Sequence, residues 1–402
     1  MPQFVSVAEA HTRIQKALTT LDAESVALTD ALGRTTAEPV RSPGSLPPFD
    51  NSAMDGYALR AADAPDVPAV LPLAFSVSID APERQLPGGA CARITTGQPL
   101  PPGADAVIRV ERTEEDGDRV RITHPVNEGQ NVRPAGENVQ AGETVVSEGQ
   151  VLTPAAISLL ASVGAAEVSV RRVPQVAVLV TGDEIVPHTE TPPPGAIRDS
   201  NGPALQAMVH TAGGEARVVH ASDNRQALRD TLATLRDVDA LVVSGGMSVG
   251  RDDLVREVLT SMGASWAFSK VKQRPGKPFG FGVWDGVPVF GLPGNPVSSA
   301  VCFEVYVRPA LARMLGRDQF HRPRHVATLT EPLRVKAGLH YFARGIATSS
   351  EEGCLEVCST GAQGSGISRS MWAANCLIHI EEERTDPQVG ERVEIEWLPG
   401  AP

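Results

Sequence analysis

Residues 239–253 read DALVVSGGMSVGRDD, and this stretch decides the fold of the chain. Residues 240–243 form a short, continuously apolar run, which is typical of a strand covered on both faces in a parallel sheet. The glycines that follow let a backbone approach a phosphate closely, and the serines add hydroxyl donors. The stretch therefore predicts a buried strand that ends in an anion-binding loop.

The segments on both sides of this loop alternate between apolar runs and helical patterns. QVAVLVTG begins at residue 175 and EARVVHAS at residue 215, and a helical segment follows each of them. Alternation of this kind is typical of strands joined by helical crossovers. It predicts a doubly wound α/β domain over residues 174–318.

The rest of the chain predicts three further parts, so the fold class is multidomain α/β plus β. Short strand-like runs broken by Gly and Pro predict an inserted β domain at 46–140, with a hairpin turn at 115–118. Helices starting at Ser6 and Pro154 are assigned to one discontinuous N-terminal domain, residues 1–45 and 141–173. Short strands after residue 319 predict a C-terminal β-barrel at 319–402.

The composition limits the classes of function. The chain has 402 residues and 36 Lys+Arg against 48 Asp+Glu, a net charge of −12 that disfavours nucleic acid and anionic lipid as partners. No apolar run approaches the roughly 18–20 residues that cross a bilayer, so we expect a cytoplasmic protein without membrane contact. The five cysteines form no CxxC pair, and Cys354 with Cys358 is read as free thiols or as a metal pair.

Three loops leave the ends of predicted strands, where ligands bind in open α/β sheets. Residues 181–184 (TGDE) place two adjacent carboxylates there, either for a cation or ligand or as a solvated turn. In the 244–250 loop, the following Asp252 and Asp253 suit a divalent cation that bridges to phosphate, or a helix cap. Neither a Walker motif nor a dinucleotide motif is present.

The third loop and one basic turn complete the candidate site. Asn295 and Pro296 predict a helix N-cap and first position, and the start of a helix favours an oxyanion. Arg274 and Lys277 sit in a proline-rigid turn, as expected for a fixed anion contact or for an ordinary basic turn.

Several strings occur together in a fixed order along the chain. They read PPFDNSAMDGYAL, ITTGQPLPPGADAVIRVE, LVTGDEI, IRDSN, VVSGGMSVGRDD, RPGKPFGFG and GLPGNPVSS. In this order the chain resembles the molybdopterin molybdenumtransferase family, which includes the C-terminal enzyme domain of gephyrin, over about residues 1–400. The resemblance implies an elongated, four-domain homodimer with a molybdopterin-binding-type α/β domain.

The resemblance also implies a reaction. A member of this family inserts molybdenum from molybdate into adenylylated molybdopterin with Mg²⁺ and releases AMP, as the final step of molybdenum cofactor biosynthesis. Contact with the molybdopterin adenylyltransferase is a further implied partnership. Two rival functions are an adenylyltransferase-like role, disfavoured by the additional β domains, and a non-catalytic scaffold or pterin carrier.

The resemblance assigns roles to individual residues. The implied catalytic positions are Asp55, Thr96, Glu184 and Asp253, and Glu184 and Asp253 are also the implied metal ligands. The implied ligand-cradling positions are Asn201, Ser244, Gly245, Gly246, Ser248, Gly250, Arg274, Lys277, Pro278, Pro293, Gly294, Asn295, Pro296 and Ser298. Asp55 and Thr96 of one subunit are expected to face the α/β cleft of the other, and residues 363–365 and Ser370 to lie near that cleft.

Three positions depart from the family pattern. Arg274 stands where Lys is frequent, which preserves the charge but changes its geometry. Gly202 stands where many members carry Arg, so one anion contact is missing or is supplied by another residue. Leu254 replaces a common Tyr and is interpreted as a packing residue.

Overall fold

The strand at 240–244 lies inside a six-stranded sheet, in a computed structural model that describes residues 4–78, 84–246 and 254–400. The strand order is β17 (Glu215–Ala221), β14 (Gln175–Thr181), β18 (Ala240–Ser244), β23 (Val287–Leu292), β22 (Gly280–Trp284) and β19 (Ser265–Phe268). The first four strands are parallel, and β22 is antiparallel to both of its neighbours. Because the chain winds outward from β14 in both directions, a crevice forms beside β14 and β18 at their carboxyl ends.

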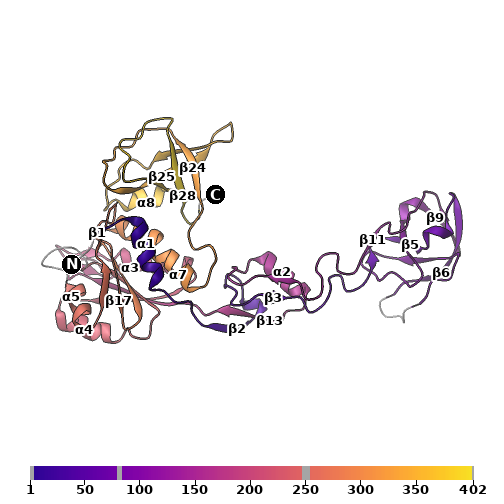
Figure 1. Ribbon diagram of the computed structural model, residues 1–402, viewed down its shortest axis with the longest axis horizontal. Coiled ribbons are helices and arrows are strands. Elements are labelled where there is room, and N and C mark those ends of the chain that lie inside the picture. Colours follow the sequence, from indigo (N-terminus) through magenta and orange to yellow (C-terminus); the bar gives the residue numbers. More distant parts are fainter. Residues whose placement is uncertain (1–3, 79–83, 247–253, 401–402) are drawn as a thin grey trace.

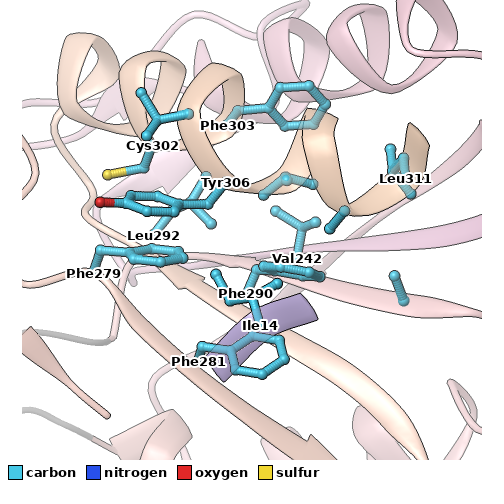
Figure 2. Packing of buried hydrophobic residues seen from close by; sticks show 14 of the residues in the cluster. Ile14, Val242, Phe279, Phe281, Phe290, Leu292, Cys302, Phe303, Tyr306 and Leu311 are labelled. Atoms are coloured by element: carbon cyan, nitrogen blue, oxygen red, sulfur yellow. The ribbon is translucent and has the colours of Figure 1, made fainter. Parts of the chain in front are cut away.

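Helices cover both faces of this sheet, as the doubly wound fold requires. On one face lie α3 (Asn201–Thr211), α6 (Pro296–Cys302) and α7 (Arg308–Met314), the last two joined by a π-helical turn at Phe303–Val307. On the other face lie α4 (Arg225–Ala233) and α5 (Leu254–Ser261). Figure 2 shows the aromatic core of the first face, in which Phe279 stacks on Tyr306 with ring centroids 4.3 Å apart.

The first helix, α1 (Val7–Lys16), was predicted to lie in one domain with α2 (Pro154–Ser162). It packs instead on the α/β domain. Its Ala10 and Ile14 are buried in the same core as α3 and α7. The strand before it, β1 (Phe4–Val5), pairs in parallel with β20 (Lys270–Val271). The start of α1 was predicted correctly, because the Ser6 hydroxyl accepts from the Glu9 N–H at 3.2 Å.

A narrow middle part connects the α/β domain to a distant β domain (Figure 1). Here β2 (Ala23–Ala27) pairs with β13 (Glu167–Arg171), and β3 (Val40–Arg41) pairs with β12 (Thr144–Val146). The helix α2 covers a small core that includes Leu28, Leu152 and Val168. It ends before Gly164, whose φ of +83° is typical of the glycine that follows the last turn of a helix.

The distant β domain lies at the far end of the molecule from the α/β domain (Figure 1). Its sheet has the order β8 (Ala106–Arg109), β5 (Gly56–Leu59), β7 (Cys91–Ile94), β6 (Ala69–Ser76), β10 (Arg119–Ile122) and β9 (Thr113–Asp116), and β4 (Asn51–Ser52) pairs with β11 (Val132–Arg133). The predicted hairpin turn joins β9 to β10. A 3₁₀ turn at Val110–Arg112 separates β9, the first strand of this hairpin, from β8.

The C-terminal domain is the predicted β-barrel. It comprises β24 (Arg324–Leu329), β25 (His340–Ser349), β26 (Leu355–Ser359), β27 (Cys376–Ile380) and β28 (Arg392–Trp397), with α8 (Ser368–Ala373) on its surface. Because β25 pairs with both β26 and β27, the five strands close. The edge pair β21 (Gln273–Arg274) and β25 connects the barrel to the α/β domain. Among the described residues, no helix is long and apolar enough to cross a membrane.

A cavity of about 570 Å³ lies where α1, the helix around α7 and the barrel meet. We call it the histidine-lined cavity, because His11, His321, His340 and His379 line it together with Glu304, Glu381, Glu396, Arg308, Arg322 and Arg324. Burial, with His321 and nearby arginines, lowers the pKa of His11 to about 3. Burial likewise lowers the pKa of the other three histidines, so all four imidazoles are neutral at pH 7.

Candidate functional site

A cleft of about 510 Å³ opens at the carboxyl ends of β14, β18 and β23, where the strand order predicts a ligand crevice. Segments far apart in the sequence meet there. The lining includes ten of the predicted site residues, namely Glu184, Asn201, Ser244, Gly245, Gly246, Pro278, Pro293, Gly294, Asn295 and Pro296. The structure therefore brings most of the predicted ligand-cradling positions into one cleft.

The glycine loop at the end of β18 requires glycine for two separate reasons. Gly245 and Gly246 have φ of +94° and +62°, in the left-handed region. A Cβ atom at Gly245 would lie 2.8 Å from the Thr181 carbonyl oxygen, and one at Gly246 would lie 2.5 Å from Val255 Cγ2. The predicted positions Ser248, Gly250 and Asp253 lie outside the described residues.

Asn201 ties the first turn of α3 to the other two loops. Its side-chain Nδ2 donates to Ser244 Oγ and to the Gly294 carbonyl oxygen, both at 2.8 Å. These bonds fix the distance between the end of β18 and the loop that precedes α6. Asn201 is therefore a positioning residue of the cleft.

The loop before α6 differs in detail from its prediction. Asn295 occupies the N-cap position and Pro296 the first helical position, but the Asn295 side chain makes no capping hydrogen bond. The Val297 N–H donates to the Ser365 carbonyl oxygen at 3.1 Å, so the C-terminal domain uses one of the free donors of the helix. Ser298 is buried and does not line the cleft.

Besides Glu184, two further carboxylates line the cleft, and the sequence analysis missed both. Asp199 is buried, and it accepts from the Gly202 N–H and pairs with His220 Nε2, each at 2.8 Å. Asp223 follows the end of β17. Asp223 could have been predicted from sequence, because it closely follows a strand and ligands bind beyond strand ends. Asp199 could not, because its position in the cleft depends on how α3 packs.

The structure explains why Gly202 departs from the family pattern. A Cβ atom at Gly202 would lie 2.3 Å from Asp199 Oδ2, so no side chain fits there while Asp199 keeps its place. Arg198, which ends the short strand β16 (Ile197–Arg198), paired with β15 (Ile185–Val186), also lines the cleft and brings a cation to its wall.

The two predicted cations of the basic turn lie outside the lining of this cleft. Arg274 extends over the ring of Tyr341 at 5.9 Å, and Lys277 Nζ lies 5.2 Å from the ring of Phe4. The turn packs closely against Cys302 of α6, because a Cβ atom added at Gly276 would lie only 2.4 Å from Cys302 Sγ. Gln273 Nε2 donates to the Pro275 carbonyl oxygen at 3.0 Å.

Arg344 on β25 is the functional candidate that sequence reasoning missed. Its residue surface is only 1% exposed, and among the described residues it meets no carboxylate. Its Nε donates to Ser370 Oγ and its Nη2 to the Gly364 carbonyl oxygen, both at 3.3 Å. Burial, and then the charge of Arg274, lowers its pKa to about 10. A buried cation with neutral partners and a second cation beside it suits a doubly charged oxyanion.

Asp55 and Thr96, two of the implied catalytic residues, contact each other. The Thr96 N–H and hydroxyl donate to Asp55 Oδ1 at 2.7 and 2.9 Å. These bonds, the backbone one first, lower the pKa of the exposed Asp55 carboxyl. Both residues belong to the distant β domain, so a single chain does not bring them to the cleft (Figure 1).

The predicted metal ligands cannot be compared directly, since Asp253 lies outside the described residues. Within the described part of the chain, no group of three His, Cys, Asp or Glu side chains could hold a metal ion. Glu184, Asp199 and Asp223 nevertheless supply three carboxylates to the cleft wall. Mg²⁺ commonly takes one or two carboxylates with substrate phosphates and water, so a site there would combine Glu184 with phosphate oxygens of the substrate and would not need all three carboxylates.

Comparison with protein-family models gives three matches along the chain. Residues 5–164 match the MoeA N-terminal region (domain I and II), residues 177–313 a probable molybdopterin binding domain, and residues 326–398 the MoeA C-terminal region (domain IV).

Individual relatives agree with these models. The chain is 36% identical to a molybdopterin molybdenumtransferase of Haemophilus influenzae, over 93% of each chain. It is equally identical to molybdopterin molybdenumtransferase 2 of Mycobacterium tuberculosis, over 92% of this chain and 94% of the other. Two solved structures of a molybdopterin biosynthesis MoeA protein from Pyrococcus horikoshii superpose with a TM-score of 0.84 each. They share 32% and 28% identity and cover 99% and 98% of this chain and 100% of the other.

Proposed function

Because this chain belongs to the MoeA family of molybdopterin molybdenumtransferases, we propose that it transfers molybdenum from molybdate to molybdopterin during molybdenum cofactor biosynthesis. The observation that carries the proposal is that two anion-binding features lie close together in one chain. One is the glycine-lined cleft of the α/β domain, and the other is Arg344 of the barrel, buried beside Arg274 and without a carboxylate partner among the described residues.

We assign the cleft to the pterin substrate in its adenylylated form. The loop at Gly245 and Gly246 exposes backbone close to the ligand, and Arg198 adds a cation that complements phosphate. Asn201 holds the Ser244 and Gly294 loops at a fixed separation, which orients the anhydride relative to the carboxylates.

We assign molybdate, the second substrate, to the junction between Arg344 and the basic turn. Molybdate is a dianion, and its charge would offset the burial of the Arg344 guanidinium. Ser370 lies within hydrogen-bond distance of Arg344 and offers a hydroxyl to an oxyanion. The arrangement explains why a barrel domain is attached to the α/β domain, since each contributes one of the two arginines.

Mg²⁺ is the proposed cofactor of the anhydride cleavage. Glu184 and, by resemblance, Asp253 are the residues that would hold it, with phosphate oxygens of the substrate as further ligands. When bound, it would neutralise phosphate charge as AMP leaves. Without a cation, carboxylates on the wall of a phosphate site would weaken binding of the substrate.

We propose a homodimer in which each cleft is completed by the partner subunit. Asp55 remains a carboxylate at neutral pH, since Thr96 stabilises its charged form. Thr96 occupies only Oδ1, and the side chain is exposed. The elongated shape separates this pair from the cleft of its own chain, so an antiparallel arrangement of two chains is the simplest way to unite them (Figure 1).

The overall transformation breaks the phosphoanhydride bond, with an oxygen from molybdate or water added at the cleaved phosphate, and releases AMP. The two dithiolene sulfurs replace oxygen ligands of molybdate, a displaced oxygen leaves as water with the thiol protons, and molybdenum stays at oxidation state VI. The residues of this chain bind and orient both substrates. We also propose a cytoplasmic location and contact with the molybdopterin adenylyltransferase, because an adenylyl-transfer enzyme must supply this substrate.

Molybdate-dependent release of AMP tests the function. Purified protein is mixed with adenylylated molybdopterin, Mg²⁺ and molybdate, and AMP is followed with and without molybdate. We expect AMP only when all three are present, and strongly reduced release by Glu184→Gln. Substrate binding without AMP release would favour a pterin carrier instead.

A further inference from the structure

A second, mostly apolar groove lies beside the cleft. Its volume is about 260 Å³, near the lower end of small-ligand pockets at about 300 Å³, so it suits a flat ring better than a whole nucleotide. It runs between α3, α6 and α8, and its apolar walls include Leu205, Met208, Val297, Ala300, Met371 and Trp372.

Trp372 is the most conspicuous residue of this groove. Its surface is 84% exposed, the highest value among the exposed large hydrophobic residues of the described chain. A tryptophan gains far more from burial or stacking than from contact with water. Its neighbour Met371 packs against the main core, so α8 is anchored on one side and presents the indole on the other. This arrangement indicates an aromatic platform that is completed by a ligand.

Ser299 provides a polar group in the same groove. It is 1% exposed, and its hydroxyl oxygen has no hydrogen-bond partner among the described residues. A buried hydroxyl without a partner loses the free energy of its bonds to water. A ligand with donors and acceptors along the edge of an aromatic ring would satisfy it.

The groove is continuous with the cleft, since Ser200, Asn201 and Pro296 line both. Asn201 therefore stands between them, with the phosphate-type loops on one side and the aromatic groove on the other. A substrate with an anionic arm and a flat, nitrogen-rich ring matches both parts at once. We propose that this groove is the seat of the pterin ring, with Trp372 and Met208 as its apolar walls and Ser299 at its polar edge. This inference rests on the proposed function.

Other occupants fit less well. An apolar side chain of a partner protein would leave the Ser299 hydroxyl without a hydrogen bond. The adenine of the leaving nucleotide is also flat, so AMP must be tested separately from pterin.

The test uses free pterin, which carries neither phosphate nor dithiolene, and its own fluorescence reports binding. We expect Trp372→Ala to weaken pterin binding roughly tenfold or more, as typical for loss of a stacking contact. Trp372→Phe should retain most of the affinity, and Ser299→Ala should weaken it several-fold. Val389→Ala, a change at a 61% exposed apolar residue of the same domain outside the groove, should leave it unchanged. The affinity for AMP should stay at the wild-type value in all four variants.

Two results would overturn the pterin seat: no binding of pterin to the wild-type protein, or equal affinity in the wild type and Trp372→Ala. A loss of AMP affinity with unchanged pterin affinity would assign the groove to adenine. A change in self-association alone would assign it to a protein interface. The transferase proposal fails separately, since it would be contradicted by wild-type protein that binds pterin but releases no AMP with molybdate.

Discussion

Replacement of Arg344 by methionine tests whether this arginine binds molybdate or only stabilises the fold. The folded, ligand-free protein holds this guanidinium with a pKa lowered from 12.5 to about 10. That difference corresponds to a cost of at most about 3 kcal/mol for keeping the charge in place. The two hydrogen bonds to Ser370 and Gly364 stabilise the folded protein by about 1 kcal/mol each. Arg344→Met should therefore leave the free energy of unfolding unchanged or raise it by about 1 kcal/mol.

Molybdate binding, in contrast to stability, should be weakened by this substitution. A hydrogen bond from a charged donor contributes about 1.5–3 kcal/mol, so we expect the molybdate Kd of Arg344→Met to rise by roughly 10- to 100-fold. Isothermal titration calorimetry gives the Kd, and urea unfolding gives the stability. Wild-type protein should also be stabilised by added molybdate, and the variant much less.

Arg308→Met is the matched control. Arg308 is also mostly removed from solvent, with a side chain that is 13% exposed, but it pairs with Glu304 and Glu396 at 3.3 and 3.5 Å. Its loss leaves Glu396 without its arginine partner and Glu304 with Arg322 alone at 3.4 Å, so we expect a destabilisation of up to about 3 kcal/mol and an unchanged molybdate Kd. If Arg344→Met destabilises as much as Arg308→Met and binds molybdate normally, the assignment of Arg344 to the oxyanion is wrong.

Three further outcomes are expected. Because burial lowers the pKa of the four histidines of the histidine-lined cavity, the unfolded chain binds more protons below pH 6.5, and thermal stability should fall as pH drops from 6.5 toward 5. The raised pKa values of Glu304 and Glu396 act in the opposite direction, since these carboxyls stabilise the folded protein at lower pH. If the histidines dominate, His379→Leu should make thermal stability depend less steeply on pH, and a steeper dependence would refute their role. Gly202→Ala should raise the substrate KM at least several-fold by displacing Asp199, and an unchanged KM would show that the loop yields at little cost. Gly276→Ala, whose Cβ would collide with Cys302 Sγ, should weaken molybdate binding more than AMP binding, and equal losses would contradict a local effect on the basic turn.

The parts of the site that could be predicted from sequence are those fixed by local rules. Ser244 and Gly245 follow a buried apolar run, so the end of β18 and its loop were predictable from periodicity and from glycine. The same holds for Pro296 at the start of α6. The doubly wound sheet and the closed barrel follow from the pattern of runs and turns, and both predictions are confirmed.

The parts that could not be predicted depend on contacts between distant segments. The apolar stripe of α1 matches two surfaces equally well, and only the core with Phe290 and Tyr306 selects one of them. Arg344 sits within a strand pattern, where nothing local reveals that its neighbours are neutral. The roles of Asp55 and Glu184 remain predictions, because they depend on a second subunit.

The most direct test of the central claim, a cleft shared between subunits, is complementation between two inactive variants. Asp55→Asn and Glu184→Gln are co-expressed with different tags, and molybdate-dependent AMP release is measured for the mixture. Random pairing makes about half of the dimers mixed, each with one intact site, so we predict about a quarter of the wild-type activity, while each variant alone stays inactive. A mixture as inactive as its two components would contradict the shared cleft.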